Sequence, residues 1–317
     1  MVKIYKSAIS SNIPNNSATA CVPGKINLYL SVEYSLENTY HNLTTIFHSV
    51  SLLDKVIVSR SDVFSLKMIG KNSYSVPLGR SNLAWRAAEL ISKKYIGILP
   101  TININIDKLL PVAGGMGGGS ADAAAVLVAM NKLFNLKLTT YKMYSMAATL
   151  GSDVSFAIHG RTALGQRHGE KLTTVLVSKP LYWVLAFPYQ ELSTCKVFDI
   201  LDKTISIINT KMIQIQSNKL TCLLTALLSG NPFKLAYFLE NSLQLVSLRL
   251  CPVLHQIIQY GLEAGALVGI VSGSGPTCFF LCSSSQSALL VKLYLTQTKI
   301  CKNVVLANGP VGGAHLI

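Results

Sequence analysis

The glycine-rich segment that begins at Leu109 constrains this chain more than any other part of its sequence. Five glycines fall within six positions: Gly114, Gly115, Gly117, Gly118 and Gly119. Ser120 and a long Ala-rich run to Leu136 follow them directly. Glycine adopts positive φ and lets backbone N–H groups approach a ligand closely. Because the start of a helix adds unpaired N–H donors and partial positive charge, the segment predicts a binding site for a di- or triphosphate.

The loop fits neither of two common nucleotide-binding motifs. A Walker A loop requires GxxxxGK[ST], which does not occur in the chain. The Gly115-x-Gly117-x-x-Ser120 spacing lacks the third glycine and the acidic ribose partner of a dinucleotide-binding unit. A flexible turn with a serine or aspartate N-cap is the simpler alternative, because Ser120 and Asp122 could each cap the helix or reach a phosphate or its metal.

The composition excludes several classes of protein. Half of the 317 residues are hydrophobic and only 13% are charged, which excludes disorder of the whole chain. No apolar run reaches the roughly 18 residues of a membrane span, so no membrane association is expected. The net charge of +14 favours anionic partners such as nucleotides or phosphorylated metabolites, although a general effect on solubility explains the charge equally well. The basic residues are spread thinly and not clustered in a stripe, so no nucleic-acid partner is expected.

The cysteines and the N-terminus bear on the compartment. The seven cysteines are scattered, with no CxxC pair and no zinc-type spacing, which is typical of reduced thiols. The first ~17 residues are polar and lack the apolar core of a secretory signal; they are expected to form a loose arm. We therefore expect a cytoplasmic protein. Its oligomeric state is expected to be a monomer or a homodimer.

The order of apolar patterns predicts an α+β fold of two packed domains. Short alternating runs from Ala18 to Lys67 predict mostly antiparallel strands. Helical patterns follow at Ser81–Tyr95 and Thr139–Leu150, and strands and amphipathic helices are mixed in the second half. Since strands and helices do not strictly alternate, a parallel doubly wound sheet is disfavoured. The predicted domains are residues 1–175 and 176–317.

Charged residues in apolar surroundings are candidates for chemistry. The alternating strand at 21–32 places Lys25 and Asn27 on the same face, which is either a solvated edge or a site. Asp153 lies between the expected helix end at Gly151 and an apolar run, where it is either a turn-capping residue or a base in a pocket. His41, beside Tyr40 at a strand start, is a candidate ligand-facing group. Asp54 is expected in a turn.

Five motifs, taken in order, resemble the GHMP kinase superfamily over nearly the whole chain. They are PGKINLYL (23–30), TYHNL (39–43), the glycine loop, GSDVSF (151–156) and SGSGPT (272–277). The resemblance implies two α+β domains with the site in the cleft between them. The motifs come nearest to the branch that uses ATP and magnesium to phosphorylate the 2-hydroxyl of 4-diphosphocytidyl-2-C-methyl-D-erythritol, a step of non-mevalonate isoprenoid precursor synthesis.

The resemblance also implies roles for individual residues. Lys25 and Asp153 match the catalytic lysine and aspartate, with Asp153 expected to accept the hydroxyl proton. The ATP phosphate loop corresponds to Pro111, Val112, Ala113, Gly114, Gly115, Met116, Gly117, Gly118, Gly119, Ser120 and Ala121, with Ser120 the side chain expected nearest the metal. The substrate residues, which hold the group that carries cytidine diphosphate, correspond to Asn27, Tyr40, His41, Thr194 and Phe198.

Three positions depart from the family pattern. Gly24 replaces an alanine, Asn38–Thr39 replaces Asp–Gly, and Cys195 replaces a proline, which weakens the alignment at Phe198. Two other functions stay open at this point. The first is a GHMP kinase that acts on homoserine, mevalonate or a sugar. The second is a non-catalytic, RNA-associated protein that uses the positive charge.

Overall fold

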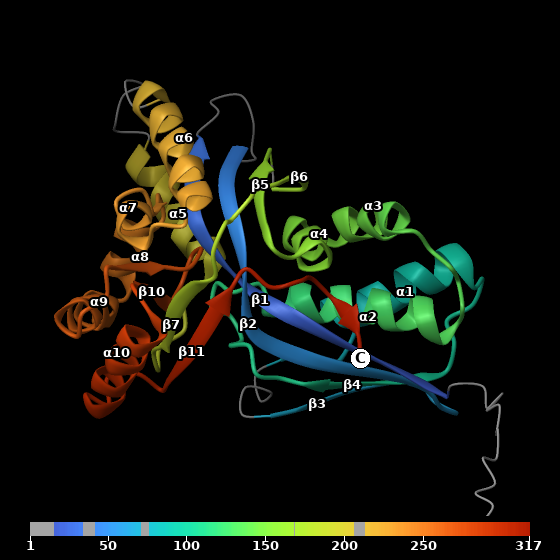
Figure 1. The fold of residues 1–317 in the computed structure, drawn as a ribbon. Coiled ribbons are helices and arrows are strands. Elements are labelled where there is room, and N and C mark those ends of the chain that lie inside the picture. The colour runs from blue at the N-terminus through green and yellow to red at the C-terminus, as the bar shows by residue number, and fades with distance from the viewer. Residues whose placement is uncertain (1–15, 34–41, 71–75, 168, 206–212) are drawn as a thin grey trace, which may run out of the picture.

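The computed structural model describes residues 16–33, 42–70, 76–167, 169–205 and 213–317. The expected N-terminal arm therefore lies almost wholly outside the described residues, and so do Tyr40 and His41. Strands and helices are mixed in two groups, each built around its own sheet, which confirms the α+β prediction (Figure 1).

Two long strands, β1 and β2, form the centre of the first sheet. The strand order in this sheet is β12-β1-β2-β4-β3. β1 (Ser17–Glu33) and β2 (Asn42–Arg60) pair antiparallel along almost their whole length. The other strands are β3 (Ser65–Ile69), β4 (Ile102–Asp107), β5 (Thr162–Gln166), β6 (Lys171–Thr174), β8 (Glu240–Asn241) and β12 (His315–Leu316). Pairing is mostly antiparallel, as expected, although β3 with β4 and β1 with β8 are parallel.

The sequence predicted shorter strands where β1 and β2 run continuously. The register of β1 against β2 shifts between Pro23 and Gly24 and again between Asn27 and Tyr29. Such bulges bend a strand without ending it, so local turn residues do not terminate pairing here. The prediction that Asp54 lies in a turn was wrong for this reason, because Asp54 lies within β2 and is fully buried.

Four helices cover one face of this sheet (Figure 1). They are α1 (Leu83–Tyr95), α2 (Gly118–Leu133), α3 (Thr140–Leu150) and α4 (Ser152–His159). α2 packs against α1, β1 and β2, and most of its residues are buried, which explains its many alanines. Thr139 caps α3 through its side chain. The helix α4 was not predicted, because its eight residues are too short for a clear period.

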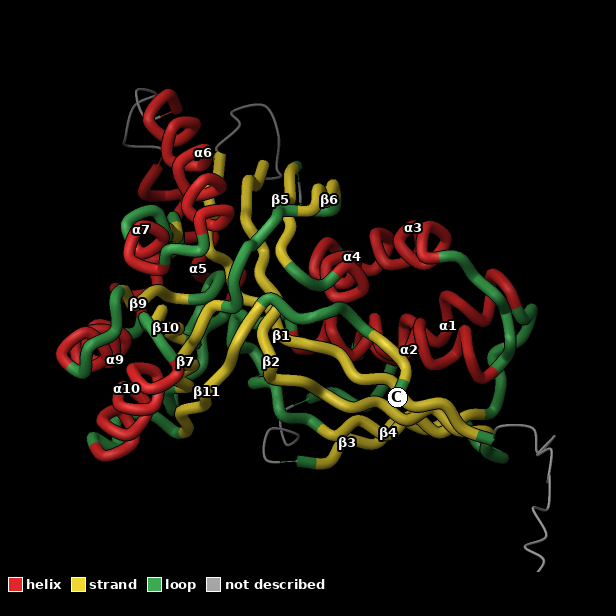
Figure 2. The backbone as a smooth tube through the Cα atoms, viewed as in Figure 1, coloured by secondary structure: helices red, strands yellow, loops and turns green. Residues whose placement is uncertain are grey.

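The second sheet is antiparallel, with the order β11-β7-β10-β9. Its strands are β7 (Leu181–Phe187), β9 (Val268–Val271), β10 (Cys278–Cys282) and β11 (Asn303–Gly309). The helices of this half are α5 (Thr194–Ile205), α6 (Ile213–Ser229), α7 (Pro232–Ala236), α8 (Gln244–Leu250), α9 (Val253–Glu263) and α10 (Ser285–Gln297). Figure 2 shows the chain crossing back after β11 to end beside β1. The predicted division at residue 175 falls between β6 and β7 and stays a prediction.

His48 joins the two sheets at their junction. Its Nδ1 lies 2.8 Å from Thr162 Oγ1 in β5, and its Nε2 accepts a hydrogen bond of 3.2 Å from Trp183 Nε1 in β7. Burial lowers the pKa of His48 to about 3, so its ring is neutral in the folded chain. His48 pairs with Ile26, the neighbour of Lys25, so this junction also supports the strand that carries the lysine.

No helix among the described residues is long and apolar enough to cross a membrane. The seven cysteines are all free thiols.

Candidate active site

The glycine loop turns sharply and leads into α2. Gly115 and Gly117 have φ of 74° and 69°, conformations that favour glycine, and Gly117 is the N-cap of the helix. The cap makes no side-chain hydrogen bond, so neither Ser120 nor Asp122 caps the helix. Both lie inside the first turns, where Ser120 lines a cavity and Asp122 is buried. Of the two alternatives for the loop, the geometry therefore favours open helix-terminal N–H groups over a side-chain cap.

A cavity of about 350 Å³ opens in front of this loop. Many of the predicted site residues line it: Lys25, Asn27, Pro111, Ala113, Gly114, Gly115, Gly117, Gly118, Gly119, Ser120, Asp153, Thr194 and Phe198. Val112, Met116 and Ala121 do not, and Met116 and Ala121 are buried in the core. The structure thus brings together residues from β1, the loop, α4 and α5, which lie far apart in the sequence.

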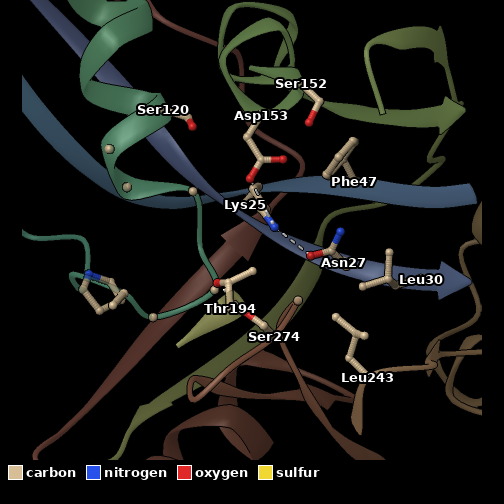
Figure 3. A pocket seen from close by; sticks show the side chains of 18 of the residues that line it. Lys25, Asn27, Leu30, Phe47, Ser120, Ser152, Asp153, Thr194, Leu243 and Ser274 are labelled. Carbon is tan, nitrogen blue, oxygen red and sulfur yellow. Dashed lines mark hydrogen bonds and ion pairs between the residues drawn. The ribbon is translucent and has the colours of Figure 1, made fainter. Parts of the chain in front are cut away.

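Lys25 and Asp153 meet at the centre of the cavity (Figure 3). Lys25 Nζ lies 3.6 Å from Asp153 Oδ2 and donates a hydrogen bond of 2.8 Å to Asn27 Oδ1. Lys25 is only 8% exposed, so the solvated-edge alternative for this strand was wrong. The reason is tertiary, because Lys25 pairs with Ser49 of β2 on one side, and on the other its backbone N–H donates a hydrogen bond of 3.1 Å to the carbonyl oxygen of Met116 in the glycine loop. Asp153 lies in the first turn of α4, with its carboxylate open to the cavity.

Asn27 is held in one orientation by a short chain of hydrogen bonds. Its Nδ2 donates to Thr45 Oγ1 at 2.8 Å, and the Thr45 hydroxyl in turn donates to the carbonyl oxygen of Tyr29 at 2.7 Å. The side-chain oxygen of Asn27, Oδ1, therefore faces the Lys25 ammonium. The face of the Phe47 ring is turned toward the same ammonium, with 5.6 Å from Lys25 Nζ to the ring centroid. Thr45 and Phe47 are functional neighbours that the sequence reasoning missed, since nothing in their local pattern differs from an ordinary strand.

A second loop, residues 272–277, belongs to the other half of the molecule and packs against the glycine loop. Ser272 Oγ donates a hydrogen bond of 3.0 Å to the carbonyl oxygen of Gly115. The two loops are so close that a Cβ at Gly115 would lie 2.0 Å from the carbonyl oxygen of Ser272. Asn241 Nδ2 donates to the carbonyls of Val271 and Gly273 at 2.7 Å each and so holds the loop in place. The SGSGPT motif marked this loop in the sequence, but it did not indicate what the loop contacts.

The opposite end of the cavity is more apolar. Leu30, Leu43 and Leu243 line it together with Phe198. Thr194 Oγ1 lies 2.8 Å from Ser274 Oγ, which links the start of α5 to the second loop. Sequence reasoning had placed Thr194 and Phe198 in the site only by resemblance, and the fold brings both to the cavity wall.

Three charged residues lie behind the glycine loop and outside the cavity lining. Lys108 lies between Asp54 and Asp122, and each of them is at most 2% exposed. Burial raises the pKa of Asp122 to about 8, and Asp54 adds to this, while Lys108 opposes it. Burial also lowers the pKa of Lys108, but the two carboxylates outweigh it and raise that pKa. The pKa of Asp122 therefore rises chiefly through burial, whereas the pKa of Lys108 rises because two carboxylates face its one ammonium group.

The family comparison agrees with the motifs. The description "GHMP kinases N terminal domain" matches residues 82–161, and "GHMP kinases C terminal" matches residues 224–300. A protein from Mycolicibacterium smegmatis named 4-diphosphocytidyl-2-C-methyl-D-erythritol kinase is 50% identical over 311 residues, which are 98% of this chain and 96% of that protein. A protein of the same name from Mycobacterium tuberculosis is 47% identical over 96% of this chain and 94% of its own length. The chain belongs to the GHMP kinase family.

Solved structures place the fold in the same family. A crystal structure titled 4-(cytidine 5'-diphospho)-2C-methyl-D-erythritol kinase is 29% identical and superposes with a TM-score of 0.73, covering 93% of this chain and all of that chain. A homoserine kinase from Cytophaga hutchinsonii reaches a TM-score of 0.75 at 18% identity over 99% of this chain and all of its own, which is a likeness of fold alone. The chain is therefore an ATP-dependent phosphotransferase that acts on a small molecule.

Proposed function

We propose that this kinase transfers the γ-phosphate of ATP to the 2-hydroxyl of 4-diphosphocytidyl-2-C-methyl-D-erythritol, in non-mevalonate isoprenoid precursor synthesis. The observation that carries the proposal is the Lys25–Asp153 pair, 3.6 Å apart, in a cavity whose wall is the glycine loop. The choice of substrate is supported by the relatives of 47–50% identity that bear this substrate in their names.

The pair performs the two tasks that phosphoryl transfer asks of a protein, positioning and charge stabilisation. Asp153 accepts the proton of the attacking hydroxyl, the freed oxygen bonds to the γ-phosphorus, and ADP leaves with the electrons of the broken P–O bond. Lys25 stabilises the negative charge around the transferred group. Asn27 fixes the direction of the Lys25 ammonium through its 2.8 Å hydrogen bond.

The loop from Pro111 to Ala121 holds the phosphates of ATP. Its glycines leave backbone N–H groups without a Cβ in front of them, and the N-terminus of α2 adds partial positive charge. Val112, Met116 and Ala121 contribute through the shape of the loop, because they do not line the cavity. Gly117 leaves room beside the catalytic pair, because a Cβ there would come 3.3 Å from Asp153 Oδ2.

Magnesium is part of the proposal. The described residues contain no cluster of three or more His, Cys, Asp or Glu side chains that could hold a metal ion. The oxygens of Ser120 and Asp153 do line the cavity, and this set fits Mg²⁺, which binds through few protein oxygens and keeps waters and substrate phosphates as its other ligands. When bound, the ion would neutralise charge on the β- and γ-phosphates. Ser120 is the proposed protein ligand.

The apolar end of the cavity is the proposed site of the cytidine group. Phe198 offers a face for the cytosine ring, and Thr194 lies beside it, bonded to Ser274. Tyr40 and His41, the proposed partners on the other side of the base, lie outside the described residues. The free state of all seven cysteines supports a reducing compartment, and we propose the cytoplasm, with the chain as a monomer or homodimer.

The test combines a substrate panel with one variant. ATP consumption is measured with 4-diphosphocytidyl-2-C-methyl-D-erythritol, homoserine, mevalonate and a hexose, and only the first is expected to support turnover. Asp153→Asn should lower kcat roughly 10²–10⁴-fold with little change in ATP affinity, as expected for loss of a general base. Asp62→Asn, an exposed turn residue, is the matched control.

Two outcomes would refute the proposal. Turnover with another alcohol, and none with the cytidine compound, would assign a different small-molecule kinase. Near-normal kcat in Asp153→Asn would remove that carboxylate from its role.

A further inference from the structure

A cluster of three charged side chains lies directly behind the glycine loop. Asp54 is 0%, Asp122 1% and Lys108 2% exposed, and none of them lines the cavity. Charges are rarely buried to this degree, because removing them from water is costly unless geometry and hydrogen bonds compensate. The cluster is therefore placed for something other than contact with the substrate.

Lys108 connects β2 and α2 through one ammonium group. Its Nζ lies 2.5 Å from Asp54 Oδ2 in β2 and 2.7 Å from Asp122 Oδ2 in α2. The same nitrogen donates a hydrogen bond of 2.9 Å to the carbonyl oxygen of Gly118, the first residue of α2. The three donor positions of a lysine ammonium are thus all used.

Asp54 fixes the other end of the loop. Its Oδ1 accepts hydrogen bonds from the backbone N–H groups of Leu109 at 2.7 Å and Leu110 at 2.8 Å. These two residues immediately precede Pro111, where the loop begins. The Asp54–Lys108 pair consequently ties the entry of the loop and its exit at Gly118 to a single buried point.

The bond to Gly118 also determines where the loop's donors point. In a planar trans peptide, the C=O of one residue and the N–H of the next are antiparallel. Because Lys108 holds the Gly118 carbonyl from behind, the N–H of Gly119 is turned toward the opposite side. Gly118 and Gly119 both line the cavity, and a Cβ on Gly118 would lie only 3.1 Å from Lys108 Nζ. One backbone layer therefore separates the ammonium from the cavity.

We propose that Lys108 is a positioning residue for ATP, which, together with Asp54 and Asp122, holds the Gly118–Gly119 peptide so that its N–H faces the nucleotide phosphates. This inference rests on the proposed location of those phosphates. It assigns Lys108 no contact with ATP or with the acceptor alcohol.

The test measures KM for ATP and KM for the acceptor alcohol separately in variants of the full-length enzyme. The primary variant is Lys108→Gln/Asp122→Asn, which removes one positive and one negative charge together and so keeps the net charge of the cluster unchanged. KM for ATP should rise at least tenfold, while KM for the acceptor alcohol stays within twofold. A second variant, Asp54→Asn, keeps an oxygen for Leu109 and Leu110 but removes an acceptor from Lys108, and KM for ATP should rise three- to tenfold.

A control variant distinguishes positioning from loss of stability. Val291→Ala leaves a cavity in the core of the second sheet, where Val291 is fully buried, and is chosen to lower the melting temperature by a similar amount. A purely structural role reduces the active fraction and leaves KM for ATP unchanged, as in this control.

KM for ATP within twofold of wild type in folded Asp54→Asn, or in the folded double variant, would overturn the inference. If Asp153→Asn is inactive at the same time, the proposed function stands and only the role of Lys108 falls. If Asp153→Asn turns over normally, the proposed function fails instead.

Discussion

His48 provides a quantitative test of how the two sheets are joined. It is fully buried, lies between Thr162 and Trp183, and its pKa is lowered by burial to about 3. The bond from Trp183 Nε1 makes Nε2 the acceptor, so Nδ1 carries the proton and donates to Thr162. Protonating Nε2 would place two donors face to face at the junction. The neutral ring is therefore required by the fold.

The resulting pH dependence follows from the two pKa values. In the unfolded chain the imidazole titrates near its ordinary pKa of 6.5, whereas in the folded chain it stays neutral down to about pH 3. Between these values the unfolded state binds the extra proton, so the free energy of unfolding falls as pH is lowered. At about 1.4 kcal/mol per pKa unit, His48 alone should remove about 2 kcal/mol of stability between pH 7.5 and pH 5.

The assay is urea unfolding of the wild type and His48→Gln at pH 7.5 and pH 5.0. The variant should be about 1–3 kcal/mol less stable at pH 7.5, because it loses well-placed buried hydrogen bonds. It should then lose about 2 kcal/mol less than the wild type on going to pH 5.0. His255→Gln, on the exposed side of α9, controls for the removal of one histidine. Equal losses in the wild type and His48→Gln would refute the reasoning.

Two further variants test the site itself. Phe198→Ala should raise KM for the cytidine substrate about 5–150-fold, since stacking of a base on an aromatic ring contributes ~1–3 kcal/mol; steady-state kinetics that leave this KM unchanged would remove Phe198 from the base site. Gly115→Ala should lower the melting temperature by several degrees, because Gly115 has φ of 74° and its Cβ would lie 2.0 Å from the Ser272 carbonyl oxygen. Gly119→Ala, whose Cβ would meet nothing nearer than 3.9 Å, should melt close to the wild type, and equal melting of the two variants would contradict this account.

The loop and the family could be inferred from the sequence because their signals are local. Five glycines ahead of an Ala-rich run favour a tight turn followed by a buried helix. The motifs around Lys25 and Asp153 likewise carry their chemistry in a few adjacent letters. The α+β class followed from the order of apolar periods, and the structure confirms it.

Other features depended on contacts between segments far apart in the chain. Asp54 resembles a turn residue in sequence, yet a bulge carries β2 past it and the fold buries it against Lys108. Lys25 and Asp153 lie 3.6 Å apart although more than a hundred residues separate them in the sequence. The helix that carries Asp153, α4, is too short to be predicted from apolar periodicity. The hydrogen bond from Ser272 to Gly115 links the two halves of the molecule.

The amino-acid sequence by itself thus determined a phosphate-binding turn, the residue types available for phosphoryl transfer and the mixture of strands and helices. Only the tertiary structure decided which of those residues face one cavity and which support it from behind. The physical reason is that φ preferences and apolar periodicity act over a few residues. The placement of a buried charge such as Lys108 is decided by partners that the fold brings together from β2 and α2.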